Sequence, residues 1–173
     1  MATFENPNNP SQPQKGVYGW YAQKGEKKIT IYIGQAGGKA TPLPKGTLFR
    51  GVSELQRNTF TSNSPDYDAL DTDFIVGTAL IFFKDRGYEC VWKHISNNPK
   101  EEIDFVRKEK PILQNPGNTN IINEFKVKKN VTGHWKSSKV LLERKKKITE
   151  AEYEIFEELT KRVSNLMTTP VLM

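Results

Sequence analysis

The sequence predicts an α+β protein: a small, largely antiparallel three-stranded sheet flanked by helices, with a C-terminal extension of strands and a helix. Two β-rich runs, 17–21 and 29–33, lie near the N-terminus, and the polar stretch around Gly25 between them indicates a hairpin. A third β-rich run, 88–95, follows two segments of helical character. A helical segment follows it, so the order is ββ-α-α-β-α, which is typical of an α+β domain.

The expected core covers residues 16–118 and begins with the hairpin. A loop rich in Gly and Pro follows at 35–47. The first helix is expected where Leu48, Val52 and Leu55 share one helix face, with a polar loop behind it.

A second helix is expected over 74–85. Asp71, Thr72 and Asp73 can cap its start, and Gly87 can end it. After the third strand, Pro99 suits the first turn of a helix over 100–108, which ends before Pro111.

Two segments flank this core. Residues 1–15 are rich in Asn, Pro, Gln and Ser and lack periodicity, so we expect a flexible arm there. Residues 119–173 form the C-terminal extension, with strand candidates at 121–127 and 137–143. Thr149 and Glu152 then form a capping-box pattern before a final helix that reaches about Leu166.

Composition is compatible with a basic protein of the cytoplasm. The net charge is +6, the pI is about 9.3 and the mean hydropathy is −0.65. No apolar run reaches the roughly 18 residues that span a membrane, and the first residues lack the order of a secretory signal. The single cysteine, Cys90, excludes an internal disulfide. The positive charge favours a polyanionic partner, although many basic proteins bind no nucleic acid.

The two hairpin strands carry a paired motif. Gly16-Val17-Tyr18 lies on the first strand and Tyr32-Ile33-Gly34 on the second. Arg50 lies on the next helix, and Glu102 begins a helical stretch that a proline terminates; Asn115 comes shortly after. In this order, over roughly residues 16–118, the chain resembles the GIY-YIG nuclease superfamily.

The resemblance implies a metal-dependent hydrolysis of DNA phosphodiester bonds. Glu102 would bind Mg²⁺, with Mn²⁺ as a substitute; one carboxylate can be enough because Mg²⁺ keeps several of its own waters. Glu101 and Asp104 are nearby alternatives on the same helix. Arg50 would hold the scissile phosphate through a planar fork of donors, which lysine could not copy.

Tyr18 and Tyr32 are expected to lie near that phosphate. The resemblance implies that Tyr18 orients or deprotonates the attacking water, with its pKa lowered by surrounding cations. The unperturbed pKa of tyrosine is about 10, so unaided base action at neutral pH is poor. A hydroxide generated at the metal, with Tyr18 as a relay, is equally compatible with the sequence.

Several positions depart from the family pattern. Tyr21 would restore the commoner spacing to Tyr32, but strand alternation places Tyr21 with Val17 on one face and leaves Tyr18 on the other. Where many members carry His or Tyr, one helical turn after the arginine, this chain has Glu54, so the proton acceptor stays open.

Other candidates have weaker support. Gln114 and Asn118 compete with Asn115 for the family's asparagine position. Lys45, in the loop before Arg50, is a further phosphate contact. His94 and Cys90 are expected to be structural.

The C-terminal extension is basic and contains aromatic residues among its charges, as expected for phosphate contact combined with stacking. Charge runs are often only solvated faces. The expected DNA contacts are Lys129, His134, Trp135, Lys136, Lys139 and Lys145.

The sequence therefore predicts a Mg²⁺-dependent endonuclease that acts on double-stranded DNA. A site-specific type II restriction enzyme, acting as a homodimer, is the favoured setting. Homing, phage and repair nucleases of the same superfamily are alternatives, as is a DNA-binding module without catalysis.

Overall fold

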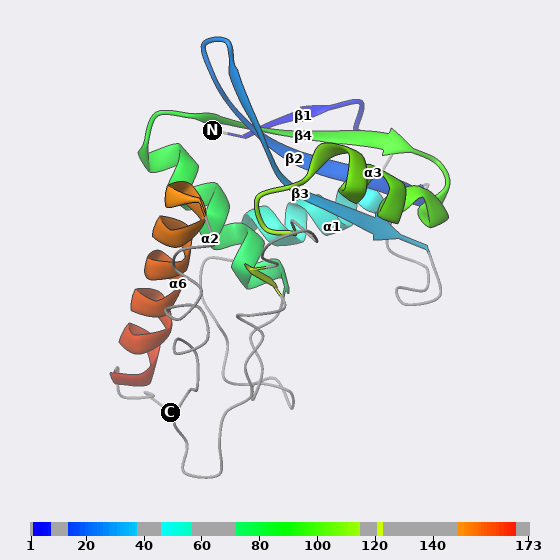
Figure 1. The fold of residues 1–173 in the computed structure, drawn as a ribbon. Coiled ribbons are helices and arrows are strands. Elements are labelled where there is room, and N and C mark those ends of the chain that lie inside the picture. Colours follow the sequence, from blue (N-terminus) through cyan, green and yellow to red (C-terminus); the bar gives the residue numbers. More distant parts are fainter. Residues whose placement is uncertain are drawn as a thin grey trace.

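A computed structural model describes residues 2–7, 14–37, 46–56, 72–114, 121–122 and 149–168. Within them the strands form one sheet and the helices pack around it (Figure 1). The α+β class predicted from the sequence is confirmed. None of the helices in these ranges has the length and apolar character that a membrane span requires.

The predicted hairpin consists of β2 (Gly16–Lys24) and β3 (Lys27–Ala36). Gly25 lies in its turn with φ of +61°, a left-handed conformation that glycine adopts without steric cost. The pairing slips by one residue beside Trp20 and Tyr21, and such a bulge increases the local twist.

The sheet has four strands in the order β1-β4-β2-β3, which corrects the expected three-stranded sheet. β4 (Glu89–Ser96) pairs antiparallel with β2, so the three predicted strands are antiparallel. β1 (Ala2–Glu5) pairs parallel with β4 and makes the sheet mixed.

The strand β1 also shows that the flexible-arm prediction for residues 1–15 is wrong at its start. Phe4 places its ring 5.6 Å from the ring centroids of both Trp20 and Trp92, and Glu5 pairs with Lys93 at 3.1 Å. The polar composition of the first 15 residues concealed this short run, whose side chains alternate between part-buried and exposed.

The helices of the core agree closely with the prediction. α1 (Thr47–Gln56) and α2 (Thr72–Asp85) precede β4, and Gly87 follows α2 with φ of +83°. The expected third helix begins as a 3₁₀ turn, η1 (Pro99–Glu101), and continues as α3 (Glu102–Glu109).

The final helix is α6 (Glu150–Thr168), and its predicted cap is present because the Glu152 N–H donates to the Thr149 hydroxyl at 3.2 Å. Ile121 and Ile122, by contrast, are helical and buried, so the strand expected from residue 121 is wrong at its start. A short apolar run does not distinguish strand from helix, which explains the error at residues 121–122. The strand expected at 137–143 lies outside the described residues.

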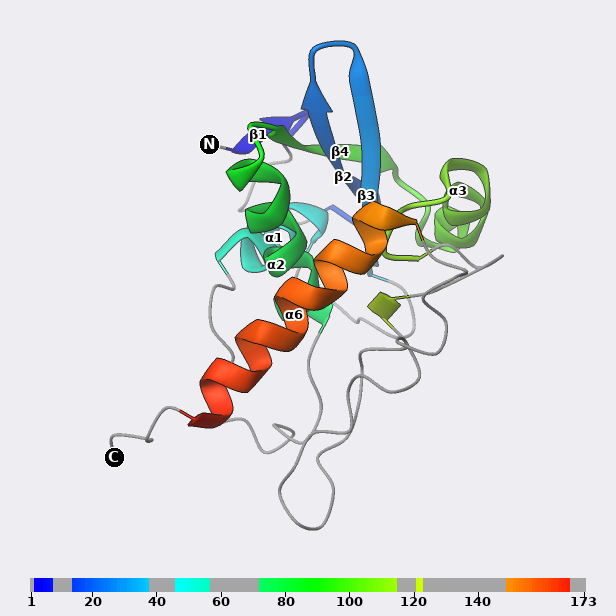
Figure 2. The same cartoon turned by 60° about the vertical axis from the view of Figure 1, so that its left-hand side comes forward.

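The helices lie on two sides of the sheet. Figure 2 shows α1 and α2 on one side and α3 on the other. The largest fully buried side chains include Trp20, Trp92 and Phe74, which belong to the core between the sheet and the first group of helices.

Close packing of Tyr18 against β3 depends on Gly34. The two residues are partners across the β2–β3 ladder, and a Cβ at Gly34 would stand 2.5 Å from the Tyr18 ring and hydroxyl. The close contact between β2 and β3 at this point therefore requires both the Tyr18 ring and the absence of a side chain at Gly34.

Gly34→Ala is expected to lower the free energy of unfolding by about 3 kcal/mol, because overpacking a buried ring costs about 1–3 kcal/mol. Gly25→Ala is the comparison, since a methyl there meets no atom within 4 Å. Its cost is confined to left-handed backbone strain of about 1 kcal/mol. Urea unfolding of both variants measures the difference, and equal losses would contradict the packing argument.

Candidate active site

The hydroxyl of Tyr18 is directed at α1. It donates to Oε2 of Glu54 at 2.9 Å, and the Nε1–H of Trp20 donates to Oε1 of the same carboxylate at 3.1 Å. Tyr18, Trp20 and Glu54 are all completely buried. The carboxylate is thus enclosed by the sheet and hydrogen-bonded through both of its oxygens.

Burial and, to a smaller extent, the negative charge of the neighbouring Asp73 raise the pKa of Glu54 to about 8. The hydrogen bonds from Tyr18 and Trp20 and the charge of Arg50 oppose this rise without cancelling it. A carboxylate held in this way weakens folding at neutral pH, and such costs are concentrated at functional sites.

Arg50 lies one helical turn before Glu54 and forms an ion pair with Asp73 of α2, with Nη2 to Oδ1 at 3.4 Å. Its Nε is buried and has no hydrogen-bond partner in the described part of the chain. Burial tends to lower the pKa of Arg50, but Tyr18, Asp73 and Glu54 together raise it, so the guanidinium stays charged. Part of its donor capacity is therefore not used by the described residues.

Tyr32 adjoins Tyr18, with ring centroids 6.2 Å apart. Burial raises the pKa of Tyr32 well above 10, and the charges of Glu54 and Glu102 add to the rise while Arg50 opposes it. Tyr18, Tyr32 and Arg50 therefore act on one another electrostatically around Glu54, and Glu102 acts on this group through Tyr32.

Glu102 is the first residue of α3, directly after η1. The hydrogen bond from Ser96 Oγ to Glu101 Oε2, at 3.0 Å, ties this turn to the end of β4. Glu102 is part-buried, and burial raises its pKa. Among the described residues it makes no hydrogen bond or ion pair, which leaves its carboxylate available as a ligand.

The protein groups around Tyr18 do not by themselves lower its pKa. Burial raises this pKa well above 10, and the negative charge of Glu54 and the neighbouring Tyr32 reinforce the rise. Arg50 lowers it, but by less. Tyr18 is therefore a poor base unless another group accepts its own proton.

Tyr21 occupies the other face of β2. Its hydroxyl donates to Glu109 of α3 at 3.1 Å, and the side chain of Lys28 lies over its ring. Tyr21 therefore lies away from Glu54, whereas Tyr18 contacts it, which favours Tyr18 over Tyr21 as the tyrosine of the Gly16-Val17-Tyr18 motif.

Two further candidates have structural contacts. His94 hydrogen-bonds through both ring nitrogens, to Thr47 at 2.9 Å and to Asn97 at 2.8 Å, which agrees with its expected structural role. The Gln114 amide exchanges two hydrogen bonds with the backbone of Ile33, at 2.7 and 2.8 Å, and so extends the edge of β3.

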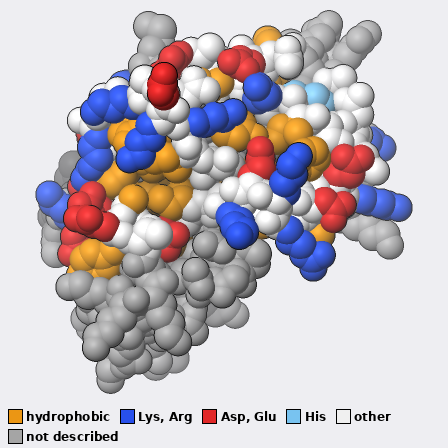
Figure 3. All heavy atoms as spheres, turned by 45° about the horizontal axis from the view of Figure 1, so that its top comes forward, with side chains coloured by type: hydrophobic (Ala, Val, Ile, Leu, Met, Phe, Trp, Pro, Cys, Tyr) orange, Lys and Arg blue, Asp and Glu red, His pale blue; other side chains and the backbone are white. Residues whose placement is uncertain are grey.

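The remaining predicted site residues lie outside the described residues: Lys45, Asn115, Lys129, His134, Trp135, Lys136, Lys139 and Lys145. On the face of the described part shown in Figure 3, Lys and Arg side chains are interspersed with Asp and Glu. That face therefore presents mixed charge instead of one continuous basic field.

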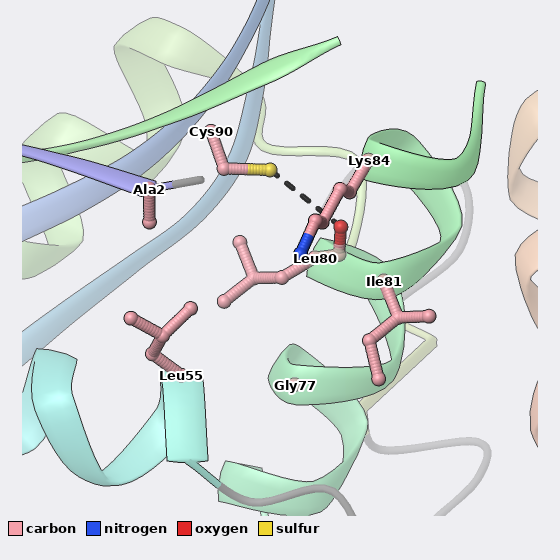
Figure 4. Close-up of a pocket in the computed structure, with 7 residues that line it drawn as sticks. All are labelled: Ala2, Leu55, Gly77, Leu80, Ile81, Lys84 and Cys90. Carbon is pink, nitrogen blue, oxygen red and sulfur yellow. Dashed lines mark hydrogen bonds between the residues drawn. The ribbon is translucent and has the colours of Figure 1, made fainter. Parts of the chain in front are cut away.

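A separate pocket of about 190 Å³ lies between α1, α2 and the β1–β4 edge (Figure 4). Cys90 contributes to its wall and directs its thiol at the Leu80 carbonyl, 3.6 Å away. Burial raises the pKa of this thiol to about 11, so it is not a nucleophile. The pocket is lined by Ala2, Leu55, Gly77, Leu80, Ile81, Lys84 and Cys90, and none of the clustered residues is among them.

Comparison of the chain with protein-family models, with curated proteins and with solved structures finds no match. The chemistry of the clustered residues is therefore the main basis for assigning a function.

Proposed function

We propose that this protein is a metal-dependent endonuclease that hydrolyses DNA phosphodiester bonds. The observation that carries the proposal is that Tyr18, Tyr32 and Arg50, which are distant in the sequence, lie together around Glu54, with Glu102 acting electrostatically on Tyr32. A cationic fork can stabilise the charge that develops on the phosphate, and an available carboxylate can hold a metal ion, two contributions that phosphodiester hydrolysis uses. The sequence resemblance to the GIY-YIG superfamily points to the same reaction.

Arg50 is the group that binds the scissile phosphate. Its charge favours a phosphate oxygen, its side chain is partly exposed, and charge-assisted bonds to a guanidinium are short and strong. Asp73 holds one end of the guanidinium, which fixes its orientation before DNA arrives. Binding of this kind also neutralises the charge that grows on the phosphate in the transition state.

Glu102 is the residue that would hold Mg²⁺. The described residues contain no cluster of three or more acidic, His or Cys side chains. A single carboxylate fits Mg²⁺ only if waters and phosphate oxygens complete the coordination, so we expect tight metal binding only together with DNA. When bound, the ion supplies polarisation of the phosphate and stabilisation of the leaving oxygen.

The biological setting that we favour is restriction in the cytoplasm, with a homodimer acting on a short palindromic DNA site. Two equivalent sites related by a twofold axis match the symmetry of such a sequence. Homing, phage and repair nucleases share the same proposed chemistry.

Plasmid cleavage tests the proposal. Supercoiled DNA is expected to be nicked or linearised with Mg²⁺ or Mn²⁺ and to stay intact with EDTA, because EDTA removes the ion that Glu102 would hold. Restoring Mg²⁺ in excess of EDTA should restore cleavage. If the protein binds DNA but never cuts varied unmodified and modified substrates, a non-catalytic DNA-binding module replaces the nuclease.

A further inference from the structure

The enclosed carboxylate of Glu54 has no evident structural need for its charge. It is completely buried, and its two hydrogen bonds come from Tyr18 and Trp20 of β2. A buried glutamate destabilises the fold unless it is well paired, and a neutral glutamine could accept the Trp20 hydrogen bond equally well.

The Trp20 N–H occupies one oxygen of the Glu54 carboxylate and leaves the other oxygen facing Tyr18. An indole N–H can only donate, so Oε1 must act as its acceptor and Oε2 is left for the Tyr18 hydroxyl. The charged groups around Glu54 come from three elements. Arg50 lies on the same helix, Asp73 on α2, and Tyr18 and Tyr32 on the hairpin.

Tyr18 needs an acceptor for its own proton. It is buried, so bulk water does not take that proton directly, and Oε2 of Glu54 is 2.9 Å from the hydroxyl. Glu109, the other glutamate bonded to a tyrosine of β2, serves Tyr21 on the other face.

We propose that Glu54 accepts the Tyr18 proton while Tyr18 takes a proton from the attacking water, so that Glu54 is the final proton acceptor. The inference rests on the proposed nuclease function and requires DNA binding to bring one water to the Tyr18 oxygen. A water O–H bond breaks and its proton bonds to Tyr18, whose own proton bonds to Oε2. The resulting hydroxide attacks phosphorus, and the leaving oxygen departs with its electron pair and is protonated by solvent.

The ionisation of Glu54 then controls the reaction. Ionised Glu54 accepts from Tyr18 and leaves a lone pair on the phenol oxygen for the proton of water. Protonated Glu54 must donate to Tyr18, since Trp20 cannot accept, and Tyr18 then has no acceptor for its own proton. Because the pKa of Glu54 is about 8, cleavage falls as pH falls below that value.

Single-turnover cleavage between about pH 6 and about pH 9 tests the proposal. The wild-type rate is expected to rise about tenfold per pH unit and to level off above about pH 8. Glu54→Gln should cut about 100-fold more slowly at the plateau and lose this dependence, since general acid–base catalysis contributes about 10²–10⁴-fold. Glu54→Asp should be slower but keep the dependence, whereas Glu109→Gln should match the wild type.

The Trp20 indole N–H resonance gives a readout that does not require cleavage. It should shift with pH in the wild type and in Tyr18→Phe, and the shift should disappear in Glu54→Gln. A Glu54→Gln enzyme that keeps the wild-type rate and pH dependence overturns this inference alone. A wild type that never cuts DNA overturns the nuclease proposal and this inference with it, even if Trp20 titrates.

Discussion

Arg50→Lys is expected to lower the cleavage rate by about 10²–10³-fold, the usual effect of removing one donor aimed at transition-state charge. Lysine keeps the positive charge but is a point charge, and it cannot reproduce the planar fork that engages Asp73 and a phosphate oxygen together. The loss should appear in the rate at saturating DNA, because the charge retained by lysine preserves most of the binding.

Folding is expected to change little in Arg50→Lys, since part-exposed ion pairs contribute about 1 kcal/mol or less. Arg86→Lys is the matched control. Arg86 is exposed and pairs with Glu154 at 3.7 Å, so its replacement should leave cleavage unchanged. Equal activity of Arg50→Lys and wild type would remove Arg50 from the chemistry.

The antiparallel part of the fold was predictable because its signals are local. The hairpin turn, the helix stops at Gly87 and Pro111 and the cap at Thr149 each depend on a few neighbouring residues. β1 was not predictable in this way. Its place depends on Phe4 reaching Trp20 and Trp92, contacts that no local pattern in the first residues announces.

The site was partly predictable. The motif order singled out Tyr18, Tyr32, Arg50 and Glu102. The structure places the first three around Glu54, and Glu102 acts electrostatically on Tyr32. Strand alternation correctly separated Tyr18 from Tyr21, since side-chain direction follows from the period of a strand.

Two participants were missed. Asp73 was interpreted only as a helix cap, yet it pairs with Arg50 from another helix. Trp20 was regarded as one residue of a β-rich run, but it orients Glu54. The burial of Tyr18 was also missed, and its effect on the pKa of Tyr18 outweighs the charge of Arg50.

Glu102→Gln is expected to reduce Mg²⁺-dependent cleavage by about 10³-fold or more, since it removes the carboxylate that would hold the cation while keeping the shape of the side chain. Excess Mg²⁺ should rescue little of the loss, because a neutral amide is a poor ligand for a hard cation. The thermal midpoint should not fall. Burial raises the pKa of Glu102, so a neutral side chain at this position relieves an unfavourable charge.

Asp104→Asn provides the control for Glu102→Gln on the same helix. Asp104 lies in the first turn of α3, as Glu102 does, but it is exposed and outside the cluster. We expect it to cleave plasmid at the wild-type rate, with an unchanged Mg²⁺ dependence. Loss of cleavage in Asp104→Asn together with full activity in Glu102→Gln would move the metal ligand to the outer face of α3. Such a result would separate the metal from the Tyr18–Arg50 cluster and contradict the proposed site.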